Sequence, residues 1–479
     1  MNYQQHNLAD TIVAIATPPG IGAIGVIRLS GKDAISIVDA VFYGKTLTEQ
    51  ASHTIHFGTI RNEENEILDE VLVSLFVAPK SYTGEHVVEV SCHGSNYIHK
   101  EVMQLFIRKG ARLAQPGEFT LRAFLNGRMD LSQAEAVADL IAAESAGAHD
   151  LALKQMRGGF SSEIQNLRQE LIDFASLLEL ELDFSQEDVE FADRIELVTL
   201  VKKIRVIIMG LIRSFQLGNV IKHGVNTVIA GRPNAGKSTL LNALLNEERA
   251  IVSDIAGTTR DTIEEVLNID GIAFRLIDTA GLREAGDQIE AIGIQKTLEK
   301  IEQSAILVYV YDVMTMELEA VKADIEKLYK PEIKTLILGN KMDELYSLHD
   351  NPLHYKEQAY MAKGGDKILQ DLKANLGIEY HFISAKRADD IAKVKSALSS
   401  LVGYEAQDQT VVSTARHYEA LSKADGSLSA VLAGLESEIP SDLVAMDIRH
   451  ALRYLGEILG EVTSEDLLSN IFGRFCIGK

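Results

Sequence analysis

The chain has 479 residues, enough for about three domains of ordinary size. A content of 46% hydrophobic and 24% charged residues is typical of a globular protein and excludes disorder over the whole chain. The 47 basic and 69 acidic side chains give a net charge of −22, which argues against unspecific coating of DNA or RNA. A local basic patch, or a nucleic acid delivered partly by a partner, is compatible with this charge.

The sequence favours a cytoplasmic location. Its longest apolar runs, such as residues 306–310, are far shorter than the ~18 residues of a membrane span. Residues 1–10 are polar and lack a signal-peptide pattern. The two cysteines, Cys92 and Cys476, are far apart and have no metal-ligand spacing, so a reducing compartment is expected and a disulfide scaffold is excluded.

Residues 1–123 are expected to form a mixed α/β domain. Strands are predicted over residues 11–16 and 25–29, on either side of a turn-forming stretch rich in proline and glycine. Two more strands are predicted over residues 71–77 and 87–90.

Residues 124–223 and 403–479 are expected to be the two halves of a helical domain. They contain strong helix formers whose apolar side chains recur at three and four positions. Helices are predicted over residues 135–144, 171–182, 198–217 and 443–459. Ser441 is the predicted N-cap of the helix over residues 443–459.

Residues 224–402 alternate strands with helices, which is typical of a parallel, doubly wound sheet inserted between the helical halves. Asp270-Gly271 predicts a hairpin turn after a strand over residues 264–268. The polar stretch 344–377 is expected to be a surface segment. Further strands are predicted over residues 227–229, 273–277, 306–311, 335–338 and 381–383.

Gly231–Ser238 matches the phosphate-binding pattern G-x-x-x-x-G-K-[ST] between an apolar strand and an amphipathic helix. Its glycines allow backbone N–H groups to converge on phosphate oxygens at a helix N-terminus. Lys237 is expected to bridge the β- and γ-phosphates, and Ser238 to offer its hydroxyl to Mg²⁺. A chance glycine turn is the alternative, and the flanking strand and helix argue against it.

Three further motifs follow in the order that a GTPase requires. Gly257–Asp261 supplies a threonine for Mg²⁺ and the γ-phosphate, and Asp278–Gly281 supplies a metal-binding carboxylate and a backbone N–H. Asn340–Asp343 and Ser384–Lys386 each follow a predicted strand. Asp343 can accept two hydrogen bonds from guanine, which adenine cannot donate, so GTP is expected and a P-loop ATPase is disfavoured.

These motifs predict a set of nucleotide-binding residues that share the loops after the strands. The set comprises Asn234, Ala235, Gly236, Lys237, Ser238, Thr239, Ser253, Thr258, Thr259, Asp278, Thr279, Ala280, Gly281, Asn340, Lys341, Asp343, Ser384, Ala385 and Lys386.

The residue after Gly281 is Leu282, where Ras-like enzymes have the glutamine that orients the attacking water. A leucine cannot orient water, so this group must come from elsewhere. The nearby carboxylates of Glu284, Asp287 and Glu290 are candidates, and the alternative is that they form a solvated start of a helix.

Six motifs are distributed over the whole chain: Thr17–Gly20, Ser81–Glu85, Pro116–Phe119, Arg122–Asn126, Gly257–Asp261 and the terminal Phe475–Lys479. Together they resemble one family over essentially the whole chain, the tRNA-modification GTPases MnmE, also called TrmE. The resemblance implies an N-terminal α+β domain similar to folate-binding modules of aminomethyltransferases, a helical domain and an inserted Ras-like P-loop GTPase domain.

The resemblance also implies partners and cofactors. Members act with MnmG (GidA), a partner that uses flavin and NADH, and add an aminomethyl or carboxymethylaminomethyl group to C5 of the wobble uridine of certain tRNAs. The one-carbon donor is 5,10-methylene-tetrahydrofolate or a related reduced folate, bound in the N-terminal domain. That domain forms a constitutive homodimer, and the GTPase domains pair on GTP binding, with K⁺ stimulating hydrolysis.

By this resemblance, Arg28, Glu85, Arg128 and Lys479 match the folate-binding positions. A pterin has the same 2-amino-4-oxo edge as guanine, so a carboxylate can read it, while Arg and Lys suit the glutamate tail. Without the resemblance, Arg28 and Glu85 would be interpreted as surface charges. Cys476 matches a cysteine implicated in the modification reaction, with a buried inert thiol as the alternative, and Cys92 is expected to pack in a core.

The resemblance assigns Mg²⁺ to Ser238 and Thr259, and the catalytic acid to Glu290. It assigns K⁺ to Asn234, Ser253, Ile255 and Thr258. No arginine finger is assigned, because Arg260 and Arg283 belong to segments with other expected tasks. A cation held by oxygen ligands can take the place of such a finger. The alternative is that Asn234 only stabilises its loop.

A second hypothesis is a regulatory GTPase that gates a partner or an assembly without folate chemistry. The two hypotheses differ at Arg28, Glu85 and Lys479, which only the modification enzyme needs for folate.

Overall fold

The computed structural model describes residues 9–183, 194–246, 265–277, 304–347, 366–403, 410–437 and 439–478. The chain divides into two compact units. One comprises Met1–Ala142, Ala152–Ile212 and Ala415–Lys479, and the other comprises Ala143–Leu151 and Arg213–Thr414. Among the described residues there is no helix with the length and hydropathy of a membrane span.

A seven-stranded sheet dominates the N-terminal part of the first unit, in the order β3-β4-β5-β6-β2-β1-β7. All neighbouring strands are antiparallel except β1 and β7. The four predicted strands are found as β1, β2, β5 and β6, whereas β3, β4 and β7 were not predicted. The strands are β1 (Ile12–Ile15), β2 (Ile24–Ser30), β3 (Phe42–Tyr43), β4 (Thr54–Arg61), β5 (Ile67–Phe76), β6 (Val87–His93) and β7 (Arg112–Leu113).

The two faces of this sheet are covered differently. Helices α1 (Ala34–Asp39) and α2 (Asn96–Arg108) pack on one face, over an apolar core to which β2, β5 and β6 contribute alternate side chains. On the other face, α3 (Glu118–Leu125) places Phe119 against Ile12 and Ala14 of β1. The part of this second face formed by β4 and β5 is exposed.

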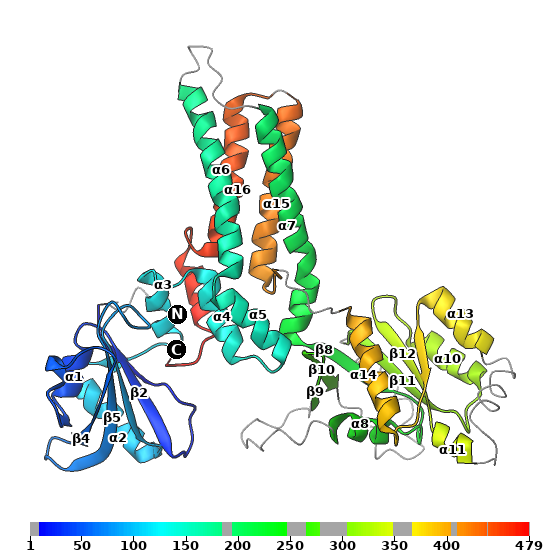
Figure 1. Ribbon diagram of the computed structural model, residues 1–479, viewed down its shortest axis with the longest axis horizontal. Helices are drawn as coiled ribbons and strands as arrows, with labels where there is room; N and C mark the ends of the chain where they lie inside the picture. Colours follow the sequence, from blue (N-terminus) through cyan, green and yellow to red (C-terminus); the bar gives the residue numbers. More distant parts are fainter. Residues whose placement is uncertain are drawn as a thin grey trace. The chain divides into compact units, whose positions relative to one another are not determined.

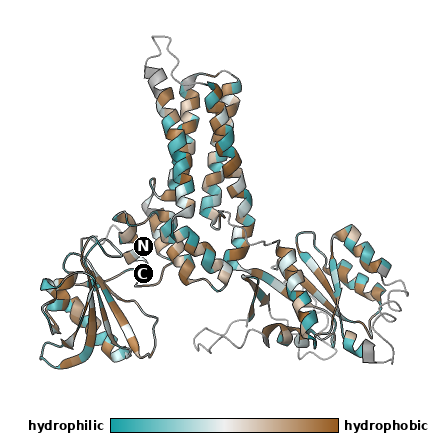
Figure 2. Ribbon diagram, in the orientation of Figure 1, coloured by the Kyte–Doolittle hydropathy of each residue, from teal (hydrophilic) through white to brown (hydrophobic). Residues whose placement is uncertain are grey.

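Four long helices lie side by side in a bundle: α6 (Gly159–Asp183), α7 (Arg194–His223), α15 (Ala415–Glu436) and α16 (Ser441–Leu459) (Figure 1). Bands of apolar and polar residues alternate along them (Figure 2), as expected for helices that bury one stripe. The shorter helices are α4 (Leu131–Ile141), α5 (Ala146–Met156) and α17 (Glu465–Phe472).

One predicted helix cap differs from the structure, and the observed helices α4, α6, α7 and α16 begin 2 to 12 residues earlier than predicted. Helix α16 begins at Ser441 and Pro440 is its N-cap, so the prediction of Ser441 as N-cap was wrong by one residue. Proline fixes its φ near −65° and lacks an N–H, which suits it to the start of a helix. A capping box is present instead at α4, where Asp130 accepts from the backbone N–H of Gln133.

A six-stranded sheet forms the core of the second unit, in the order β13-β12-β11-β8-β10-β9, parallel except for β9. Separate apolar cores lie on its two faces. The strands are β8 (Val225–Ala230), β9 (Glu265–Ile269), β10 (Ile272–Ile277), β11 (Ile306–Asp312), β12 (Lys334–Asn340) and β13 (Glu379–Phe382); the helices are α8 (Lys237–Asn246), α10 (Leu318–Leu328), α11 (Met342–Ser347), α13 (Asp366–Leu376) and α14 (Ala388–Val402).

The turn between β9 and β10 has the predicted form. Asp270 and Gly271 have φ values of 50° and 85°, as a two-residue turn with two left-handed positions requires. The stretch 344–377 is partly helical, because α11 and α13 occupy its described ends.

A buried charge cluster joins three helices of the first unit. Glu135 of α4 accepts hydrogen bonds of 2.9 and 2.8 Å from Arg416 of α15, and its Oε2 lies 2.9 Å from Nε2 of His417. Arg416 also donates to the carbonyl oxygens of Glu457 and Ile458 at the end of α16. Burial alone would raise the pKa of Glu135, but the attraction of His417 and Arg416 outweighs it and holds this pKa at about 2.

We expect this charge cluster to make the free energy of unfolding depend on pH. Because the pKa of Glu135 falls from 4.5 to about 2 on folding, its contribution, on the order of 3 kcal/mol, is present above the unfolded value and lost as pH falls toward 2. Glu135→Gln should therefore lower the urea midpoint of helix unfolding at pH 7, and the difference from wild type should shrink between about pH 5 and pH 3.

The matched control is Glu419→Gln, which removes an exposed pair with Lys423 on α15 and should shift the midpoint little. A constant difference between wild type and Glu135→Gln over this pH range would contradict the assignment.

Candidate functional site

The phosphate-binding loop connects β8 to α8. Gly231 and Gly236 have φ values of 147° and 91°, and Asn234 is left-handed at 61°. A Cβ at Gly231 would lie 2.0 Å from the carbonyl oxygen of Val310, and one at Gly236 would lie 2.2 Å from Nδ2 of Asn340. Both glycines are therefore required by conformation and by close contact.

Lys237 spans this loop from the first turn of α8. Its Nζ donates to the carbonyl oxygens of Gly231 and Arg232 at 2.7 and 2.9 Å, and burial lowers its pKa. The ammonium thus lies over the loop, where phosphate oxygens can replace the two carbonyls as acceptors. Ser238 follows directly on α8 and is exposed, so its hydroxyl is accessible to a hard cation such as Mg²⁺.

Asn340 connects the phosphate-binding loop to the segment after β13. Its side chain is 2% exposed, donates from Nδ2 to the carbonyl oxygen of Ala235 at 2.9 Å and accepts at Oδ1 from the backbone N–H of Ala385 at 3.0 Å. Lys341 is left-handed, with φ of 72°, and its Nζ lies 2.7 Å from Asp312. The buried amide of Asn340 therefore holds the phosphate-binding loop and the Ser384–Lys386 segment together.

Asp343 is held by the segment after β13. Its Oδ1 accepts from the Ser384 hydroxyl at 2.8 Å and its Oδ2 from Lys386 Nζ at 2.9 Å. Burial raises its pKa, but the hydrogen bonds from Lys386 and Ser384 outweigh burial, so the pKa lies below its usual range. The carboxylate is therefore ionised at neutral pH and retains lone pairs for further donors.

Several predicted nucleotide-site residues lie outside the described residues. They are Ser253, Ile255, Thr258, Thr259, Asp278, Thr279, Ala280, Gly281 and Glu290, and their predicted roles stay predictions.

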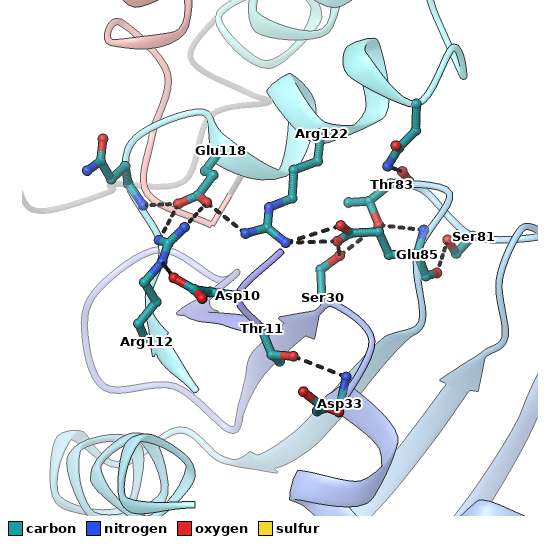
Figure 3. Close-up of polar contacts among 12 residues, drawn as sticks. Asp10, Thr11, Ser30, Asp33, Ser81, Thr83, Glu85, Arg112, Glu118 and Arg122 are labelled. Carbon is teal, nitrogen blue, oxygen red and sulfur yellow. Dashed lines mark hydrogen bonds and ion pairs between the residues drawn. The ribbon is translucent and has the colours of Figure 1, made fainter. Parts of the chain in front are cut away.

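A second polar site lies in the N-terminal domain, between β2, α3 and the loop that carries Glu85. Glu85 accepts from the Ser30 hydroxyl at 2.7 Å and from Arg122 Nη1 at 3.2 and 3.0 Å (Figure 3). Ser30 and Arg28 are two positions apart on β2 and face the same side of the sheet. Arg28 lies beside Tyr82 and Phe119, with ring centroids 5.8 and 5.7 Å from its Cζ.

Arg128 and the C-terminal tail approach the same place. A Cβ at Gly84 would lie 3.5 Å from Cγ of Arg128, and Asn126 donates to the carbonyl oxygen of Thr83 at 2.7 Å. Arg28 Nη1 donates to the carbonyl oxygen of Gly478 at 3.3 Å. Lys479 is outside the described residues, but the residue before it lies at Arg28. The three described positions, Arg28, Glu85 and Arg128, thus belong to one region of the first unit.

Phe472 and Phe475 anchor the tail in an apolar cluster with Leu121 and Leu131. The backbone N–H of Gly117 donates to the carbonyl oxygen of Cys476 at 3.4 Å. The Cys476 side chain is exposed, so the alternative of a buried thiol is wrong. Cys92 is buried in the core of the sheet, as expected, and burial raises its pKa to about 11.

The sequence did not single out Arg122 and Glu118 as site residues. Arg122 is 2% exposed, yet it pairs with Glu85 and, through Nη2, with Glu118 at 2.9 Å. The Glu118–Arg122 spacing of four residues on one helix was the available signal.

A phosphate-binding loop at the end of β8, together with the Asn340–Asp343 and Ser384–Lys386 segments at neighbouring strand ends, defines a P-loop GTPase. The rest of the chain specifies the family. The model of the MnmE helical domain matches residues 131–476, and that of the GTP-binding protein TrmE N-terminus matches residues 11–128.

Relatives named tRNA modification GTPase MnmE match over nearly their full length. That of Cytophaga hutchinsonii is 54% identical and covers 99% of this chain and 98% of its own. Those of Flavobacterium psychrophilum and Christiangramia forsetii are each 52% identical over 98% of this chain, and 99% and 100% of their own. The chain therefore belongs to the MnmE (TrmE) family and is a GTPase of tRNA modification.

Asp343→Asn is expected to weaken GTP binding and to reduce the preference for GTP over ATP. The amide has one acceptor oxygen where guanine offers two donors, and sites built for such donors discriminate on the order of 10⁴-fold. Competitive titration of GTP, ATP and ITP measures this preference. Glu344→Gln, which changes a neighbouring charge 3.9 Å from Lys386, is the control. GTP affinity equal to wild type in Asp343→Asn would refute base reading by this carboxylate.

Proposed function

We propose that this GTPase acts with the flavoprotein MnmG (GidA) to add an aminomethyl or carboxymethylaminomethyl group to C5 of the wobble uridine of certain tRNAs. In this proposal residues 1–123 bind 5,10-methylene-tetrahydrofolate or a related reduced folate and form the dimer. Residues 224–402 hydrolyse GTP, and residues 124–223 and 403–479 form the helical domain, whose tail completes the folate site. The cytoplasm, where tRNA and GTP occur together, is the implied compartment.

The observation that carries this proposal is the meeting of Glu85, Arg28 and the tail at Gly478. A pterin presents donors along its 2-amino-4-oxo edge, which suit a carboxylate such as Glu85. The glutamate part of a folate is anionic and suits Arg128 and Lys479, and also Arg28, which already pairs with Glu89 at 2.8 Å. The Arg28 guanidinium also suits a flat ligand, because guanidinium groups stack on conjugated systems. The exposed Cys476 is available for chemistry at this site.

The GTPase proposal assigns phosphate binding to Lys237, and Mg²⁺ to Ser238 and Thr259. A bound Mg²⁺ would neutralise charge on the β- and γ-phosphates. Glu290 orients the attacking water in place of the absent glutamine. Asn234, Ser253, Ile255 and Thr258 would hold a K⁺ ion, which would supply the positive charge that an arginine finger supplies in other GTPases. Asn234 is exposed in the loop, which supports this assignment because its amide oxygen is accessible to a cation.

The homodimer proposal is supported by the exposed sheet face. Ile55 and Phe57 of β4 are each 66% exposed and Leu72 of β5 is 47% exposed, and Phe57 pairs with Leu72 across the strands. Ile24 of β2, on the same face, is 67% exposed. Contiguous apolar side chains on a sheet face are typical of a protein interface. A second copy of the chain is the proposed occupant, and the GTPase domains of the dimer pair on GTP binding.

Deletion of residues 475–479 should test the folate function directly. Because the tail contacts Arg28 and packs beside α3, we expect the deletion to abolish tRNA modification and to weaken binding of tetrahydrofolate by more than about 10-fold. GTP hydrolysis should remain close to wild type, since its residues belong to the other unit. The measurements are a tetrahydrofolate titration and modification of tRNA by the complex with MnmG.

A matched control for this deletion is Arg474→Ala, which leaves the tail in place. Full modification activity after the deletion would refute the role of the tail. A wild-type chain that binds no reduced folate, but still supports modification, would favour the regulatory GTPase instead.

Potassium should accelerate GTP hydrolysis, and Asn234→Ala should remove the acceleration. An arginine finger contributes about 10³ to 10⁵ in rate where one is used, so a cation in its place should give a large effect. Initial rates in KCl and NaCl at matched ionic strength measure this. The smaller Na⁺ should fill the site poorly, and equal rates in the two salts would refute the proposal.

A further inference from the structure

A chain of alternating charges runs through the N-terminal domain and ends at Glu85 (Figure 3). Arg112 donates to both oxygens of Glu118, at 2.9 and 2.6 Å, and to Asp10 at 3.2 Å. Glu118 accepts in turn from Arg122 at 2.9 Å, and Arg122 donates to both oxygens of Glu85. Two guanidinium groups thus alternate with three carboxylates.

The middle of this chain is buried and both of its ends are more exposed. The side chains of Arg122 and Glu118 are each 2% exposed, against 22% for Glu85 at one end and 20% and 42% for Arg112 and Asp10 at the other. Of the two carboxylates that pair with Arg122, Glu85 is the one that a ligand can reach. Its carboxylate has about four lone-pair positions, and Arg122 and Ser30 use the side that faces the protein.

Stability alone does not account for this arrangement. Nε of Arg122 is buried and has no hydrogen-bond partner among the described residues. A buried charge with an unpaired donor is unfavourable, and apolar residues of similar volume often stabilise a protein as well as a buried ion pair does. The geometry nevertheless directs both Nη groups of Arg122 at carboxylates, which fixes where the Glu85 carboxylate lies.

Helix α3 sets this geometry. Glu118 and Arg122 are four residues apart and so lie on the same side of the helix. The helix starts at Gly117, with φ of 68°, where a Cβ would lie 2.5 Å from the carbonyl oxygen of Phe472. Arg112 and the backbone N–H of Gln115 fix Glu118 from the chain before the helix. Arg122 therefore has little freedom to turn away from Glu85.

We propose that Arg122, held by Glu118 and Arg112, is the positioning residue of the folate site: it orients the Glu85 carboxylate toward the pterin edge. The inference rests on the proposed folate function. It goes beyond that function, because it gives a residue that does not touch the ligand a contribution to the affinity for folate. Arg122 acts through Glu85 alone, so substitutions at the two positions must be coupled.

The test is a double-mutant cycle read by anaerobic titration of tetrahydrofolate. Arg122→Met keeps the length of the side chain and removes the charge, and we expect tetrahydrofolate to bind about 10- to 100-fold more weakly. Arg122→Lys should recover part of this affinity, because one ammonium cannot serve two carboxylates as a guanidinium does. In a Glu85→Gln background, Arg122→Met should change affinity less than about twofold.

A purely structural Arg122 predicts the opposite pattern, in which the losses of the two single variants multiply. Arg205→Met, which removes a two-point ion pair with Asp425 in the bundle, controls for the loss of any partly buried arginine and should leave folate affinity unchanged. GTP hydrolysis and the melting temperature of each variant report whether the chain is folded. If Arg122→Met does not fold, Ser30→Ala removes another donor to the same carboxylate and should weaken binding about 2- to 10-fold.

The possible failures are distinguishable. A wild-type chain that does not bind tetrahydrofolate overturns the folate function, and the inference with it. A wild-type chain that binds tetrahydrofolate, with Arg122→Met binding within twofold of it, overturns only the positioning role. Multiplying losses in the double variant overturn it as well.

Discussion

A guanidinium group can be buried only where its charge is paired, and this constraint organises the N-terminal domain around Arg122. Glu118 comes from the same helix, whereas Glu85 comes from a loop 37 residues earlier. Pairing with both therefore fixes the loop against α3. The start of the same helix packs against Phe472, so the loop, the helix and the C-terminal tail are fixed with respect to one another. Arg28 donates to the carbonyl oxygen of Gly478 in the same region.

The GTPase site and the proposed folate site each hold a carboxylate in place with the same kinds of side chain. In each, one carboxylate accepts from a hydroxyl and from a cation: Asp343 from Ser384 and Lys386, and Glu85 from Ser30 and Arg122. Such partners fix the direction of the carboxylate, and lone pairs remain for the donors of a ring. Guanine and pterin share that donor edge, so the same arrangement suits both. The cation differs in burial, since Lys386 is exposed and Arg122 is enclosed.

The sequence predicted best those elements whose signal is local. Strands β11 and β12 are continuous apolar runs because both their faces are buried, and the nucleotide motifs follow them directly. Strand β4 was not predicted, because Ile55 and Phe57 are exposed while His56 is buried, which reverses the usual alternation. The role of Arg122 depends on a contact with Glu85 across the fold, and no local pattern contains such a contact.

The tip of the β9–β10 hairpin is fixed by contacts with residues distant in sequence. In sequence, this hairpin lies between the predicted site residues Thr259 and Asp278. The backbone N–H of Gly147 donates to the carbonyl oxygen of Gly271 at 2.9 Å, and a Cβ at Gly147 would lie 2.5 Å from that oxygen. Arg275 of β10 adds an ion pair of 2.9 Å with Glu144. The hairpin is therefore connected to the start of α5 at Gly147 and to the residues just before this helix at Glu144, so a displacement of the hairpin would break or move these contacts.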